Sequence, residues 1–200
     1  MRSVVRDVCM LALLVVAGSI TSAQEQEKKY DVKSGMIVFE TTTMEGRIRT
    51  SGRVVVYFDD FGRRERKDTY AGGFLKESVL CDGEDAYTVL HDKKVVFKRG
   101  PAMAGTEIRF DDEIVSRGGT SGFRLLPAVT IAGYECRALE HVDGQLTMRM
   151  AGWSHLLLYR EDIQPGLHWI ARAAKVDLGV KLSPAMFVPP MTYEARAALF

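Results

Sequence analysis

The chain has 200 residues, of which 46% are hydrophobic and 26% are charged, with 27 basic and 26 acidic side chains. This length suits one domain with a hydrophobic core of its own. The near balance of charge gives no electrostatic reason to expect binding to nucleic acid, which requires a basic surface.

Residues 1–23 have the pattern of a secretory signal peptide. Arg2 and Arg6 make the start basic, residues 8–20 are almost wholly apolar, and small residues lead to Ala23. The apolar stretch is shorter than the ~20 residues that a membrane-spanning helix needs. We therefore expect cleavage after Ala23 and a single mature β domain over residues 24–200, with no stable membrane span.

The expected location of the mature protein is the periplasm. Cys9 lies inside the apolar stretch and not at the cleavage point, so a lipid anchor on a cysteine is not expected. The signal peptide holds two basic residues and one acidic residue, so its removal leaves equal numbers of positive and negative charges. We expect this neutral, exported protein to be a monomer.

Strand-like segments follow one another at short intervals before residue 100. They are rich in β-branched and aromatic residues and are separated by glycine and aspartate turns. The tripeptide Asp60-Phe61-Gly62 is predicted to join two of them as a hairpin connection. The predicted strands are 30–43, 53–58, 63–70, 76–81, 86–91 and 95–97.

A short amphipathic helix is predicted after Pro101, over residues 107–117. Thr106 can cap its start, and glycines follow its end. Phe110 and Ile114 lie four residues apart and would share its apolar face.

Strand patterns then resume. Residues 134–141 and 145–151 predict a hairpin about an Asp-Gly turn, and residues 153–159 predict a further strand. Residues 167–178 fit either a helix, because of their alanines, or a strand, because of their aromatic and β-branched residues. Prolines exclude regular structure around residues 186–188, and the last ten residues suit a short helix or a loose tail.

Two cysteines, Cys81 and Cys136, remain after removal of the signal peptide. In an oxidising compartment they could form a disulfide, which requires Cα atoms within about 7 Å of each other. Two free thiols are the alternative, and the separation of the cysteines in the sequence does not decide between them.

The sequence contains no recognisable catalytic or metal-binding motif. No histidine lies in a metal-ligand spacing, and no serine lies in a GxSxG nucleophile motif. Asp111 and Asp112 are adjacent on the predicted helix, where their side chains would point apart. We therefore expect a protein that is not an enzyme and that has no metal and no cofactor.

Large apolar residues are more numerous than one thin layer of structure requires. They can form an ordinary packed core, or they can line the concave face of a sheet, capped by the helix, that takes an acyl chain. The residues predicted to line such a site are Phe39, Tyr57, Phe74, Phe97, Phe110, Met148, Met150, Trp153, Leu156 and Trp169.

Four segments resemble motifs of exported bacterial proteins of the LolA/LolB-like, lipoprotein carrier-like superfamily. They are YDVKSGMI (30–37), YFDDFGRRE (57–65), IAGYEC (131–136) and AMFVP (185–189). The resemblance implies a mainly β (α+β) fold, a curved antiparallel sheet or incomplete β-barrel with one or a few helices packed on its concave side. It also implies a strand over residues 167–178. It identifies no site residue.

Members of this superfamily bind lipids, lipoprotein acyl chains or other apolar ligands. The first functional hypothesis is therefore a periplasmic, non-enzymatic binding or carrier protein for an acyl chain, lipid or lipoprotein. The alternative is an envelope protein-interaction or sensor module that pairs with its partner through a sheet edge. The polar strand 63–70 is the candidate edge for that pairing.

Overall fold

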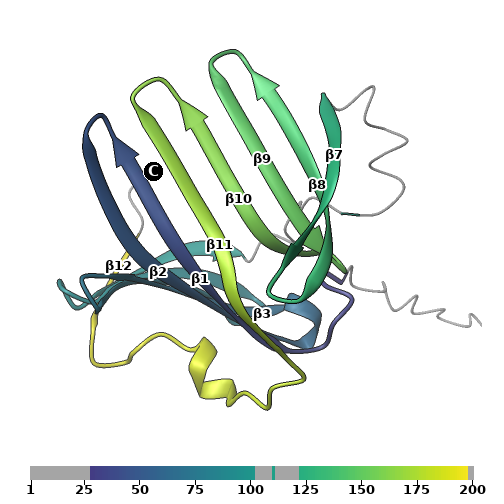
Figure 1. The fold of residues 1–200 in the computed structure, drawn as a ribbon. Helices are drawn as coiled ribbons and strands as arrows, with labels where there is room; N and C mark the ends of the chain where they lie inside the picture. Colours follow the sequence, from purple (N-terminus) through teal and green to yellow (C-terminus); the bar gives the residue numbers. More distant parts are fainter. Residues whose placement is uncertain (1–27, 102–109, 111–121, 198–200) are drawn as a thin grey trace, which may run out of the picture.

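A computed structural model of the chain describes residues 28–101, 110 and 122–197, which form one twelve-stranded sheet (Figure 1). Alternating apolar and polar residues with many β-branched side chains favour these strands. The strands are β1 (Gly35–Glu45), β2 (Ile48–Asp59), β3 (Arg64–Ala71), β4 (Phe74–Cys81), β5 (Asp85–Leu90), β6 (Val95–Pro101), β7 (Phe123–Ile131), β8 (Tyr134–Asp143), β9 (Leu146–Trp153), β10 (Leu156–Gln164), β11 (Leu167–Leu178) and β12 (Glu194–Ala197).

The strand order is β12-β6-β5-β4-β3-β2-β1-β11-β10-β9-β8-β7. Neighbouring strands are antiparallel, except that β12 pairs with β6 in parallel. The pairing of β1 with β11 joins the two halves of the chain. The sheet is curved and does not close, since β12 and β7 stand at its two ends. The prediction of a mainly β fold with a curved, open sheet is confirmed.

The helical elements of the described residues are two short 3-10 turns, η1 (Asp60–Gly62) and η2 (Pro184–Phe187). The predicted helix over residues 107–117 lies outside the described residues, apart from Phe110. A helix on the concave side is therefore not confirmed. η2 corrects the expectation of no regular structure around residues 186–188: Pro184 stands at the start of the turn, where its fixed φ suits a helical conformation.

The connection between β2 and β3, which is η1, and the strand over residues 167–178 are confirmed. The strand over 153–159 is wrong, because a turn at Ser154 and His155, both with positive φ, separates β9 from β10. The last residues form neither a helix nor a loose tail up to Ala197, because β12 pairs with β6. Strand β7 was not predicted.

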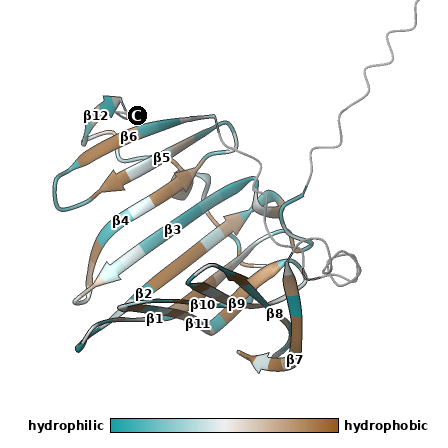
Figure 2. Ribbon diagram, turned by 90° about the horizontal axis from the view of Figure 1, so that it is seen from above, coloured by the Kyte–Doolittle hydropathy of each residue, from teal (hydrophilic) through white to brown (hydrophobic). Residues whose placement is uncertain are grey.

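The prediction of a free edge at residues 63–70 is also wrong. This segment is β3, which pairs with β2 on one side and with β4 on the other. It is largely hydrophilic although it lies inside the sheet (Figure 2). Polar side chains of β3 find partners on both faces of the sheet: Glu65 accepts from Tyr30 on one face, and Asp68 accepts from Ser78 on the other.

The two faces of the sheet are named here by residues that alternate along the strands. Phe39, Val54 and Ala171 lie on the front face, and their cross-strand partners continue it across the centre of the sheet. Asp68 and Arg172 lie on the back face by the same register. Core residues occur on both faces, so each face must be covered.

The segment that follows β11 covers the back face of β3. The guanidinium of Arg66 donates to the carbonyl of Met186 at 3.2 Å, and the guanidinium of Arg64 lies over the ring of Phe187 at 5.7 Å. Phe187 is fully buried. The segment is therefore held by an aromatic side chain that fills a site against the sheet.

Beyond η2, a chain of buried polar groups holds Tyr193 against the same face. Ser78 donates to the carboxylate of Asp68 and lies 2.8 Å from Nε2 of His91. Nδ1 of His91 lies 3.3 Å from the hydroxyl of Tyr193, and the two rings meet edge to face. These hydrogen bonds provide partners for the buried carboxylate of Asp68. They also hold Tyr193 next to β12, which begins at the following residue and pairs with β6.

Phe187→Ala is expected to lower the free energy of unfolding by about 3–5 kcal/mol, because it removes a fully buried aromatic ring. Urea denaturation followed by circular dichroism measures this change. The matched control is Val188→Ala, since the neighbouring Val188 is half exposed and its loss should cost no more than about 0.5 kcal/mol. Equal stability of the two variants would show that the segment does not anchor on the sheet.

Candidate functional site

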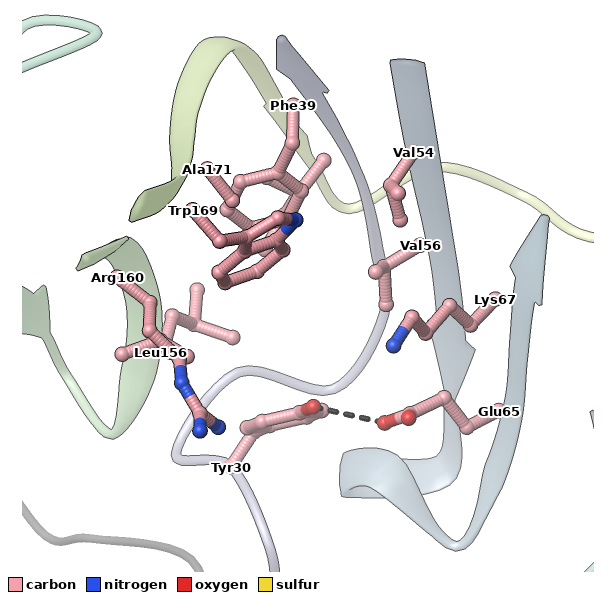
Figure 3. A pocket seen from close by; sticks show the side chains of 12 residues that line it. Tyr30, Phe39, Val54, Val56, Glu65, Lys67, Leu156, Arg160, Trp169 and Ala171 are labelled. Atoms are coloured by element: carbon pink, nitrogen blue, oxygen red, sulfur yellow. Dashed lines mark hydrogen bonds between the residues drawn. The ribbon is translucent and has the colours of Figure 1, made fainter. Parts of the chain in front are cut away.

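The front face of the sheet contains a pocket with a volume of about 250 Å³. We call it the apolar pocket. Strands β1 to β3 line one side and β10 and β11 line the other, because the sheet curves between them (Figure 3). Its lining residues are Tyr30, Ile37, Phe39, Val54, Val56, Glu65, Lys67, Leu156, Leu157, Arg160, Trp169 and Ala171.

Tyr30, which precedes β1, closes one end of the pocket. Its ring packs edge to face on the buried ring of Phe58, with centroids 4.7 Å apart. Its backbone N–H donates to the carbonyl of Phe61 in η1. Gly62 permits this approach: it has a φ of +86°, and a Cβ there would lie 2.7 Å from the Tyr30 ring. The end wall of the pocket thus depends on the turn between β2 and β3.

Polar groups border the apolar pocket on both sides, with Glu65 and Lys67 on β3 and Arg160 on β10 (Figure 3). The carboxylate of Glu65 accepts from the Tyr30 hydroxyl and from Lys29, each at 2.7 Å. Arg160 donates two hydrogen bonds to Asp162, whereas Lys67 has no ion-pair partner among the described residues. The pocket therefore combines aliphatic and aromatic walls with ammonium and guanidinium groups, an arrangement that suits an apolar group next to a negative charge.

The structure brings three of the ten predicted lining residues together in the apolar pocket, namely Phe39, Leu156 and Trp169. A separate core cluster with Leu139 takes up Phe110, Met148 and Met150. Trp153 packs against the ring of Tyr134, with centroids 4.7 Å apart. The ligand-lining role of these residues stays a prediction.

The remaining predicted residues lie away from the apolar pocket. Tyr57 lies on the back face by its register with β1, Phe97 lies on β6, and Phe74 is 72% exposed beside the β3–β4 turn. Sequence reasoning missed Tyr30 and Ala171, which line the pocket. No sequence pattern marks Tyr30, an aromatic residue before the first strand, or Ala171, a small residue within a strand, as part of a pocket. Only the curvature of the sheet brings them together.

Cys81 and Cys136 are free thiols in the structure. Six strands separate β4 from β8 in the sheet order, and neighbouring strands lie ~4.8 Å apart, so the two cysteines are not brought together. Each thiol donates to a backbone carbonyl, and burial raises the pKa of both. The structure therefore has the free-thiol alternative.

The back face of β7 to β11 carries a ladder of opposite charges. Glu140 accepts from Arg124 at 2.6 Å and from Arg149 at 2.9 Å. Arg149 also donates to Glu161, whose second oxygen lies 2.7 Å from Nε2 of His168. Each strand contributes one member. The pairs from Arg124 to Glu161 are directly opposed on neighbouring strands, and His168 is a diagonal neighbour of Glu161; both positions lie within reach of a side-chain contact.

The ladder keeps its buried carboxylates ionised. Burial acts to raise the pKa of Glu161, but hydrogen bonds from His168, Tyr159 and Arg149 outweigh it and hold the pKa below its ordinary value. Hydrogen bonds from Arg149 and Arg124 lower the pKa of Glu140 in the same way. The folded state is thus stabilised by negative charge at these two positions.

Glu161→Gln is expected to make the stability of the protein less dependent on acidic pH. A carboxyl group whose pKa is lowered by folding stabilises the protein above its unfolded pKa, and this contribution is lost as the pH falls through the folded pKa. The wild type should therefore lose stability below about pH 4.5 more steeply than the variant. At neutral pH the variant should be less stable by about 1–3 kcal/mol, since it loses charged hydrogen bonds.

Urea denaturation at a series of pH values from neutral to acidic tests this expectation. Glu135→Gln is the control, because it removes an exposed carboxylate on β8 that is not part of the ladder. Parallel pH profiles for Glu161→Gln and the wild type would contradict the role given to the ladder.

Comparisons with known proteins place the fold. No protein-family model matches the chain, and no curated protein matches it. An uncharacterized conserved protein from Thermus thermophilus is similar in structure, with a TM-score of 0.58 and 12% identity over 86% of this chain and 94% of that chain. At this identity the likeness shows a shared fold.

The solved structures that match also include a LolA superfamily protein. That protein, from Nitrosomonas europaea, has 11% identity over 82% of this chain and 93% of that chain, with a TM-score of 0.37. The MucA/MucB complex of Pseudomonas aeruginosa matches at 11% identity over 82% of this chain and 57% of that chain, with a TM-score of 0.44.

In the part of the chain that the structure describes, no helix is both long and apolar enough to cross a membrane. No group of three or more histidine, cysteine, aspartate or glutamate side chains there could hold a metal ion. The candidate site is thus the apolar pocket with the polar groups beside it.

Proposed function

We infer that this protein is a periplasmic binding or carrier protein that takes the end of an acyl chain into the apolar pocket. The observation that carries the proposal is the pocket itself, which lies on the concave part of one sheet. Ile37, Phe39 and Leu156 form its walls and are each less than 9% exposed. Binding here would shield apolar surface of the ligand, and no chemical step is needed.

The volume of the apolar pocket suits only part of one acyl chain. Its volume of about 250 Å³ falls just below the range of about 300–1,000 Å³ that is typical of small-molecule sites. The terminal part of one acyl chain fits this volume and the apolar walls, and the rest of a larger lipid would lie outside the pocket. Each buried CH₂ contributes ~0.8 kcal/mol, or roughly a fourfold gain in affinity.

The polar groups beside the pocket give the ligand a direction. Glu65 is already bonded to Tyr30 and Lys29, so it has little need of a further donor. The ammonium group of Lys67 has no ion-pair partner among the described residues and is available to an anionic head group. Because Lys67 is exposed, this attraction should be weak and sensitive to salt.

Fatty acids with a brominated acyl chain should quench the fluorescence of Trp169 when they bind. Trp153→Phe leaves Trp169 as the single tryptophan, because the sequence has two. In this background, affinity should rise about fourfold for each added CH₂ and then level off once the pocket is full. Ala171→Leu should reduce the affinity at least tenfold, because its larger side chain fills the pocket.

Ala174→Leu is the matched control, since Ala174 lies exposed on the same strand, and it should bind as the parent does. Thermal unfolding must show that Ala171→Leu is folded at the temperature of the titration. An unchanged affinity in a folded Ala171→Leu variant, or no dependence on chain length, would overturn the proposal.

A second candidate function is interaction with an extended segment of an envelope protein through a sheet edge. Strand β7 ends the sheet, so one side of its backbone is unpaired within the described residues. Leu125 on this strand is 52% exposed. β7 thus replaces β3 as the edge that such an interaction would use.

A photo-crosslinking amino acid at Leu125, expressed in cells, tests this second candidate. A partner that adds a strand to β7 should give one dominant crosslinked protein at this position. The same amino acid at Val188, which is also half exposed but lies far along the chain from β7, is the control. Identical products at both positions, or none at Leu125, would count against edge pairing.

A further inference from the structure

The back face of the sheet contains a second pocket, which we call the basic pocket. Its volume is about 330 Å³, within the range of small-molecule sites. It lies on the opposite face from the apolar pocket, because Tyr159 and Arg172 line the one while their neighbours Arg160 and Ala171 line the other. A ligand in one pocket would therefore not occupy the other.

A bend in β7 builds the basic pocket. The pairing of β7 with β8 shifts register between Leu126 and Val129, around Pro127. Past this point β7 reaches back over the sheet, and the carbonyl of Thr130 accepts from the guanidinium of Arg172 on β11 at 3.1 Å. Three strands lie between β7 and β11 in the sheet order, so the bend encloses space between them.

The walls of the basic pocket are mostly apolar. Val129 and Ile131 of β7 face Ala138 of β8 and Ala151 of β9, and all four line the pocket. Small alanines on β8 and β9 leave room beneath the larger side chains of β7. An aliphatic or aromatic body of modest size would find apolar surface on both sides.

The charged groups that line the basic pocket differ in whether they have a partner of opposite charge. Glu161 and Arg149 are neutralised within the charge ladder. Arg172 is different, since it donates to the neutral carbonyl of Thr130 and has no carboxylate partner among the described residues. Its guanidinium carries further N–H donors in a planar fork, so the pocket has one positive charge in excess.

We propose that the basic pocket binds a small amphiphilic anion whose carboxylate or phosphate group pairs with Arg172 and whose apolar body lies against β7 and the alanines. A guanidinium fork matches the two oxygens of either group. The apolar body supplies most of the binding free energy, because Arg172 is exposed and its attraction for the anion is screened by water. The site is distinct from the apolar pocket and does not depend on its function.

Methyl NMR of the full chain with labelled isoleucines tests this site. The protein is titrated with octanoate, octyl phosphate and octanol in turn. Ile131 reports on the basic pocket and Ile37 reports on the apolar pocket. Octanoate or octyl phosphate should shift the Ile131 signal in a saturable way, and the tighter of the two identifies the head group. Octanol should bind about tenfold more weakly, because it lacks the charge.

Arg172→Gln should weaken the binding detected at Ile131 by about tenfold, whereas Lys175→Gln should not change it. Lys175 is an exposed cation on the same strand that pairs with Asp177, so this control removes the same charge away from the pocket. Ala151→Leu should also abolish the Ile131 response by filling the pocket.

The proposal is overturned if no probe shifts Ile131, if octanol binds there as tightly as the anions, or if Arg172→Gln binds like the wild type. Ala171→Leu separates this result from the function proposed for the apolar pocket. It should abolish the response of Ile37 and leave that of Ile131 intact. A response at Ile37 alone would be consistent with binding in the apolar pocket and would contradict binding in the basic pocket.

Discussion

A single sheet has two faces, and this sheet has core side chains on both of them, so both faces need cover. In the described residues this cover comes from the segments before β1 and after β11 and from the curvature of the sheet. The lead-in before β1 places Tyr30 against Phe58 on the front face, and the segment after β11 places Phe187 on the back face. At the far end, β7 bends back until Thr130 meets Arg172. Both pockets are the spaces that this cover leaves unfilled.

The same requirement explains why polar residues lie in the middle of the sheet. Alternate side chains of β3 face opposite sides, so Glu65 and Lys67 border the apolar pocket while Asp68 faces the segment after β11. A carboxylate buried without partners would cost several kcal/mol. Ser78 and Arg66 satisfy Asp68, and the polar strand is thereby stable in an interior position.

The two pockets differ in how their charges are used. The apolar pocket has its carboxylate bonded at one end and a lysine exposed beside it, so its walls dominate its chemistry. The basic pocket lies next to a continuous ladder of paired charges, in which Arg172 stands apart because its partner is a carbonyl. The two proposed sites lie on opposite faces and share no lining side chain, so a ligand in one would not exclude a ligand from the other.

The sequence by itself determined the strand-rich class of the fold and most of the strands. Alternation and turn residues act over a few neighbours, so they are legible in the chain. The sequence did not reveal the turn at Ser154 and His155, which has no glycine, or the strand β7, which contains Pro127.

Only the tertiary structure decided which residues form a site. Phe39, Leu156 and Trp169 meet because β1 pairs with β11 and the sheet curves there, whereas Phe74 and Phe97 are equally apolar and lie elsewhere. The placement of Cys81 and Cys136 follows from six intervening strands. Pairing between strands distant in the sequence, and the bending of the sheet, depend on the packing of the whole domain. For that reason, local patterns predicted the elements and could not predict the pockets between them.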